Sequence, residues 1–155
     1  MLFLLFQKFI FLGCLGILIE NLFTGLWSLA HRHWKLTTNS YLWMYPIYGL
    51  AGIMLDALRQ ALPWPFWLKA LVYLPLIYGL EALSGLILVS GTTLLQRWFG
   101  GAGGGVVPWE YKKSIWSPLG LINLSYAPFW FILALGFDWI AAGLQKVVVF
   151  IGTQV

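Results

Sequence analysis

Charge is what this sequence has least of. Asp, Glu, Lys and Arg make up only 9% of its 155 residues, against about 25% in ordinary soluble domains. A soluble protein of this size could not cover its surface with so few charges, whereas a chain that is 61% hydrophobic suits a bilayer. We therefore predict an all-α polytopic membrane protein with a single transmembrane domain over residues 1–155, integral to the cytoplasmic (inner) membrane if the source is bacterial.

Several chemical motifs are absent as well. Cys14 is the only cysteine, which excludes an intramolecular disulfide framework. No phosphate-binding loop of the type Gly-x-x-x-x-Gly-Lys-Ser/Thr occurs, and no nucleophile motif is visible, so the sequence does not decide whether the protein is an enzyme. His31 and His33 have no third ligand nearby, and we expect neither a metal nor a cofactor. The basic residues are scattered singly, so we expect no nucleic-acid partner.

Four apolar stretches have the length needed to cross a bilayer, which takes about 20 residues. They cover residues 2–29, 41–58, 66–95 and the stretch from just after Pro118 to Gly143. Asn39 and Ser40 predict an N-terminal cap for the second helix, and Pro128 predicts a kink in the fourth. Asp56 and Asp138 lie near the ends of spans, where water reaches them, so we assign neither to a site.

Two glutamates stand out because they lie inside predicted spans. An ionisable side chain at membrane depth costs several kcal/mol unless it is paired or neutralised, so Glu20 and Glu81 are candidate functional residues. Thr24 follows Glu20 on the same helix face, and Tyr78 and Ser84 share a face with Glu81. Small and hydroxyl residues allow close helix contact with hydrogen bonds across it. These five residues form our predicted central polar site.

A short internal similarity connects the two glutamates. Residues 19–25 resemble residues 80–85, and such a repeat predicts a duplicated two-helix unit with the two carboxylates at similar depth. If the carboxylates face each other, repulsion between like charges keeps at least one proton on the pair at neutral pH. The site is then open to three interpretations: proton coupling, cation binding, or acid/base chemistry on a lipid-borne substrate. A protonated carboxylate that merely joins two helices is the structural alternative.

The loop after the third predicted span carries the motif Trp109-Glu110-Tyr111. We interpret it either as an anchor at headgroup depth or as a gate over the helix bundle. Asn123 and Tyr126 begin the fourth span and would reach the central carboxylates if they turned inward.

Several segments, taken in order, resemble one family. They are residues 20–27, 42–49, 81–85, 109–111 and 120–124, which read ENLFTGLW, LWMYPIYG, EALSG, WEY and GLINL. This series is similar to the CmpB-like family, labelled an ABC transporter type IV family, which includes the vertebrate transmembrane protein 229 proteins. The resemblance implies a permease-like membrane protein, and any ATPase would have to be a separate subunit.

Three functions therefore follow as hypotheses. The first is a small transporter or permease-like subunit with a central glutamate pair. The second is a membrane-embedded enzyme that acts on a lipid or isoprenoid substrate, with the glutamates as general acid and base. The third is a non-catalytic subunit of a membrane complex. The expected partners are the lipid bilayer and either a second copy of the chain or a partner membrane subunit.

Overall fold

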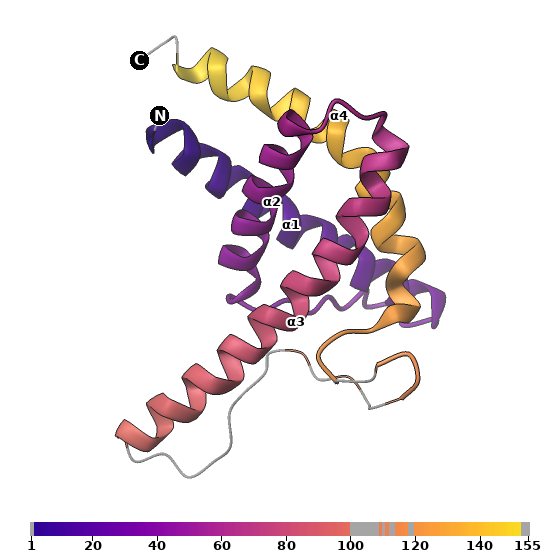
Figure 1. Cartoon of the computed structure of the whole chain (residues 1–155). Coiled ribbons are helices and arrows are strands. Elements are labelled where there is room, and N and C mark those ends of the chain that lie inside the picture. Colours follow the sequence, from indigo (N-terminus) through magenta and orange to yellow (C-terminus); the bar gives the residue numbers. More distant parts are fainter. Residues whose placement is uncertain (1, 100–108, 110, 112–113, 118–119, 153–155) are drawn as a thin grey trace. The chain divides into compact units, whose positions relative to one another are not determined.

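The fold is all-helical in the part of the chain that the structure describes. The computed structural model describes residues 2–99, 109, 111, 114–117 and 120–152. Its elements in chain order are α1 (Leu2–Ala30), α2 (Met44–Ala61), α3 (Phe66–Phe99), the 3₁₀ helix η1 (Leu124–Tyr126) and α4 (Ala127–Gly152), as labelled in Figure 1. The predicted all-α class is confirmed.

Three stretches of helix are long and apolar enough to cross a bilayer. Within the described residues they are Leu2–Ala30, Phe66–Phe99 and Leu124–Val147. These helices are compatible with a multi-pass protein embedded in a membrane. The helix α2 is not among them, because its 18 residues include the polar Asp56, Arg59 and Gln60. The prediction of four spans is thus not confirmed, and neither is the duplicated two-helix unit.

Several predicted helix boundaries were wrong. The N-cap position of α2 is Trp43 and not Asn39 or Ser40. The fourth helix begins at Ala127, after η1, and not just after Pro118. Pro128 therefore lies in its first turn, where the missing backbone N–H of proline costs nothing.

By contrast, the proline that does lie inside a long helix is Pro75 of α3. A proline in a helix interior removes a backbone hydrogen bond.

The chain forms two compact units, each of which is described by itself. The N-terminal unit comprises Met1–Pro63 together with Asp138–Val155, and the central unit comprises Trp64–Phe137. The first contains α1, α2 and the later part of α4. The second contains α3, the segment that follows it, η1 and the start of α4.

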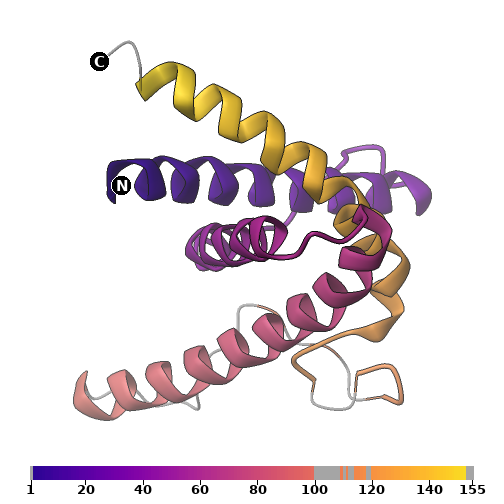
Figure 2. The same ribbon diagram turned by 45° about the horizontal axis from the view of Figure 1, so that its top comes forward.

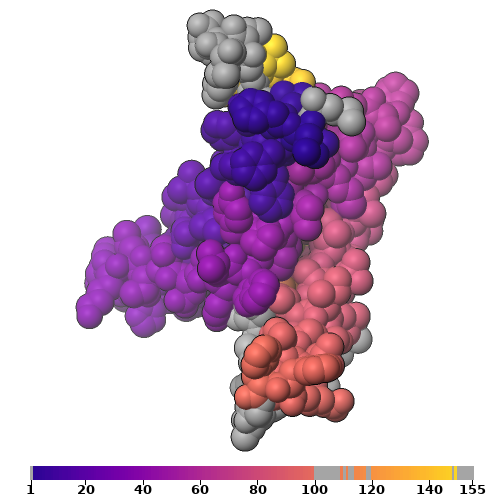
Figure 3. All heavy atoms as spheres, turned by 90° about the vertical axis from the view of Figure 1, so that its left-hand side faces the viewer, coloured from indigo at the N-terminus to yellow at the C-terminus, as the bar shows by residue number. Residues whose placement is uncertain are grey.

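Glycines allow α1 and α2 to pack closely within the N-terminal unit (Figures 2 and 3). A Cβ atom on Gly49 would lie 2.7 Å from the ring of Phe9 and 2.9 Å from the backbone oxygen of the same residue. A Cβ atom on Gly52 would lie 2.8 Å from the Cβ of Leu12. These distances are shorter than van der Waals contact, so the seam between α1 and α2 requires glycine at both positions.

The core of the central unit is built around Tyr73. This side chain is fully buried (0% exposed), and its ring meets that of Phe137 edge-on with 5.8 Å between the centroids. Ala70 and Ala134 are also buried, and their small side chains allow the neighbouring large rings to be enclosed.

Candidate functional site

The carboxylate of Glu81 lies near the middle of α3 and is only partly satisfied. Its Oε1 atom accepts a hydrogen bond of 3.1 Å from the hydroxyl of Tyr111. Its Oε2 atom is buried and has no hydrogen-bond partner among the described residues. A buried polar atom without a partner is rare in folded proteins and calls for an explanation.

Tyr111 is held in place by the segment that follows α3. Its backbone N–H donates to the backbone oxygen of Gly120 at 3.1 Å, and Gly120 adopts a positive φ of 69° that glycine tolerates. The indole Nε1–H of Trp109 donates to the backbone oxygen of Leu121 at 2.9 Å. Leu121 in turn lies over Gly85, where an added Cβ would be 3.1 Å from the leucine side chain. This segment therefore places the Tyr111 hydroxyl at Glu81.

Two more tyrosines belong to the same neighbourhood. Tyr78 is buried and lies one helical turn before Glu81. Its hydroxyl donates to the backbone oxygen of Asn123 at 3.2 Å. The ring of Tyr126 meets the ring of Tyr111 edge-on, with 6.0 Å between the centroids. The site is thus one carboxylate with Tyr111 bonded to it and Tyr78 on its helix face, while Tyr126 is linked to it through Tyr111. Asn123 joins the site through its backbone and not through its side chain.

Glu20 has a separate set of partners in the N-terminal unit. Its Oε2 atom accepts a hydrogen bond of 2.6 Å from the hydroxyl of Ser40, and Tyr48 also hydrogen-bonds this carboxylate. Ser40, expected to cap α2, instead bonds to α1. Glu20 and Glu81 lie in different units, each with its partners in its own unit, so their pairing stays a prediction.

Thr24 and Ser84, which were predicted to belong to the central polar site, donate their hydroxyl hydrogen bonds to backbone oxygens and not to the carboxylates. The hydroxyl of Thr24 donates to the backbone oxygen of Glu20 at 2.9 Å, and that of Ser84 donates to the backbone oxygen of Glu81 at 3.0 Å. Such bonds to the preceding turn are the usual way in which a helical Ser or Thr satisfies its own hydroxyl.

The loop motif is described only in part, because Glu110 lies outside the described residues. Trp109 and Tyr111 are both half-buried and bond within the central unit. Tyr111 contacts Glu81, and the choice between an anchor and a gate stays a prediction.

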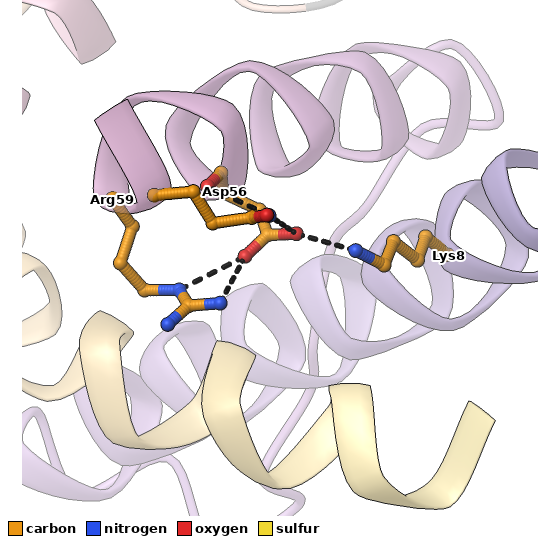
Figure 4. Close-up of polar contacts among 4 residues, drawn as sticks. Lys8, Asp56 and Arg59 are labelled. Carbon is orange, nitrogen blue, oxygen red and sulfur yellow. Dashed lines mark hydrogen bonds and ion pairs between the residues drawn. The ribbon is translucent and has the colours of Figure 1, made fainter. Parts of the chain in front are cut away.

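An ion cluster between α1 and α2 was not predicted from the sequence (Figure 4). The ammonium of Lys8 lies 2.7 Å from Oδ2 of Asp56, and Arg59 donates from Nε and Nη2 to Oδ1, both at 2.9 Å. Gln60 adds a bond of 3.1 Å to Oδ2. Asp56 is only 4% exposed and Lys8 only 7% exposed, so the expectation that water reaches Asp56 was wrong.

One signal in the sequence pointed to this cluster. Asp56 and Arg59 are spaced three residues apart, which places them on one face of a helix. Their bond to Lys8 depends on the packing of α1 against α2, which no local pattern reveals.

The described residues contain no group of three or more His, Cys, Asp or Glu side chains that could hold a metal ion. No known family model matches this chain, and no solved structure matches it. The resemblance to the CmpB-like family therefore stays a prediction.

Proposed function

We propose that this protein is a small membrane carrier or permease-like subunit in which Glu81 binds and releases a proton or a cation. The observation that carries the proposal is the buried Oε2 atom of Glu81, which has no hydrogen-bond partner among the described residues. Glu81 belongs to a helix that is long and apolar enough to cross a bilayer.

The Oε2 atom of Glu81 has bonding capacity that no described residue meets. A buried carboxylate oxygen without a donor costs free energy, because nothing replaces the water that it lost. A proton, or the positive group of a ligand, would supply the missing partner. An ionisable residue at membrane depth is a typical element of ion and proton pathways. Because Tyr111 holds only Oε1, the second oxygen stays available for exchange.

Two further features belong to the same proposal. We place α2 beside α1 inside the bilayer as a fourth helix, since Lys8 and Arg59 offset the charge of Asp56. We also propose membership of the CmpB-like family, on the ordered segments that resemble it. Energy coupling through ATP would then need a separate nucleotide-binding subunit, because the chain has no phosphate-binding loop.

Carbodiimide labelling tests the proposal without knowledge of the substrate. Dicyclohexylcarbodiimide reacts with protonated carboxyl groups in apolar surroundings, and peptide mass spectrometry locates the adduct. We expect Glu81 to be labelled at neutral pH in the purified chain. Asp56, whose carboxylate is held by two cations, serves as the internal control and should stay unlabelled.

The variant Glu81→Gln should lose this adduct while it keeps its helical circular dichroism. Absence of labelling at Glu81 in the folded wild-type chain, with or without added cations, would refute the role that we assign to its carboxylate.

A further inference from the structure

We propose that Glu81 and the tyrosines Tyr78, Tyr111 and Tyr126 form a binding site for a lipophilic organic cation, such as a substituted ammonium. This inference rests on the proposed function and names the class of ligand that its carboxylate takes. Three observations carry it: the charge of the site, its lack of hard ligands, and its aromatic rings; the apolar character of the helix that bears Glu81 agrees with them.

The charge of the site matches one positive group. Glu81 is its one carboxylate and takes part in no ion pair among the described residues. The Tyr111 hydroxyl that bonds Oε1 is neutral. A monovalent cation beside Oε2 would therefore neutralise the site with no residual charge left at membrane depth.

The ligands needed for an inorganic ion are missing. Calcium takes about six to eight oxygen ligands, and magnesium demands a near-octahedral shell. Here Oε1 of Glu81 already accepts from Tyr111, and the backbone oxygen of Asn123 already accepts from Tyr78. No cluster of three metal-binding side chains exists among the described residues. A small inorganic ion would lose its hydration shell and regain few of those contacts.

Aromatic rings favour an organic cation instead. The faces of tyrosine rings attract positive charge, with about 0.5–2 kcal/mol for each contact. Tyr78 is on the same helix face as Glu81, and Tyr111 bonds to Glu81. The ring of Tyr126 is in contact with the ring of Tyr111. An organic cation spreads its charge over a large apolar volume, so its transfer from water costs less and its carbon atoms gain contact area.

The face of α3 opposite Glu81 is apolar and exposed. Leu83, Leu86 and Ile87 are all more than half exposed, within two turns of Glu81 but turned away from it along the helix. A lipophilic cation concentrates in the apolar surroundings that such a helix requires, whereas a strongly hydrated ion does not.

The test uses tetraphenylphosphonium as the probe and the full-length chain in detergent. Isothermal titration should show saturable binding of one probe per chain. Glu81→Gln should weaken this binding by about 10-fold or more, because it removes the counter-charge. Tyr126→Leu, which removes a ring and keeps an apolar side chain, should weaken binding by about 3- to 30-fold.

Tyr41→Phe is the matched control for Tyr111→Phe, because Tyr41 is an exposed loop tyrosine of the N-terminal unit. We expect Tyr41→Phe to leave the affinity within about 2-fold, since it removes no ring face. We expect Tyr111→Phe to change the probe affinity by more than Tyr41→Phe does, because the hydrogen bond to Oε1 of Glu81 is lost. Circular dichroism and size-exclusion profiles equal to those of the wild type establish that each variant is folded.

Two results would overturn the inference. One is the absence of saturable probe binding to a wild-type chain whose Glu81 is still labelled by carbodiimide. In that case the carboxylate keeps its proposed role and the ligand is not an organic cation. The other is an unchanged probe affinity in folded Glu81→Gln, which would place the probe elsewhere on the chain. Failure of the labelling itself would instead count against the proposed function.

Discussion

Each of the two compact units buries a carboxylate, and their surroundings differ in one decisive respect. Asp56 in the N-terminal unit is bonded by two cationic side chains and by Gln60. Among the described residues, Glu81 in the central unit has one neutral donor on one oxygen and none on the other. A carboxylate with every bonding position filled holds helices together, whereas one with an empty position can take up a ligand. The arrangement of donors, and not burial alone, separates the two roles.

The glycines of the two units show the same contrast. In the N-terminal unit, Gly49 and Gly52 each touch the facing helix so closely that no side chain fits. In the central unit, Gly79 and Gly91 of α3 have no atom of the described residues within 4 Å of where a Cβ would stand. The seam between α1 and α2 is tightly closed, while stretches of α3 retain space beside the backbone.

Replacement of Asp56 and of Glu81 should give the largest difference between the two units in the free energy of unfolding. Asp56→Asn leaves the buried Lys8 and the half-buried Arg59 without a counter-charge, and we expect a loss of about 3–5 kcal/mol in the free energy of unfolding. Glu81→Gln should change it by less than about 1 kcal/mol, since the new amide still accepts from Tyr111 and supplies donors of its own. Reversible denaturation in mixed detergent micelles measures both. Equal losses of stability in the two variants would show that the two carboxylates do not differ in structural role.

Alanine substitution of one glycine in each unit should give a smaller difference in the free energy of unfolding. Gly49→Ala pushes a methyl group into the ring and backbone of Phe9, and we expect about 1–3 kcal/mol of destabilisation from overpacking. The matched change Gly79→Ala meets open space and should stabilise α3 by up to about 1 kcal/mol through helix propensity. The same denaturation assay reports both values. A neutral Gly49→Ala would mean that the seam can widen at no cost.

The smallest effect is expected for the hydroxyls next to the glutamates. Ser84→Ala and Thr24→Ala remove bonds made only to the preceding helical turn, so stability should change by less than about 0.5 kcal/mol. The rate of carbodiimide labelling at Glu81 should stay within about 2-fold in Ser84→Ala. A clear change in that rate would return Ser84 to the central polar site that the sequence predicted.

Much of the fold follows from the sequence because long apolar runs have few alternatives to helix in a bilayer. Glu81 was singled out for the same reason, since a carboxylate in such a run is costly. The partners of the carboxylates could not be predicted. Tyr111 is 30 residues from Glu81, and Lys8 is 48 residues from Asp56, so both bonds depend on tertiary packing. The prediction that Ser40 caps α2 was wrong because a capping residue and a long-range hydrogen-bond donor look alike in sequence.

The segment that carries Trp109 and Tyr111 has a consequence for biogenesis. It is not helical at these residues, yet it bonds to the middle of α3. Irregular backbone at that depth in a bilayer is tolerated only when it is enclosed by protein or lines water. In the membrane carrier that we propose, Trp109 and Tyr111 could therefore not enter the lipid by themselves. Insertion of α3 and α4 would come first, and the bond from Tyr111 to Glu81 would form as a late step.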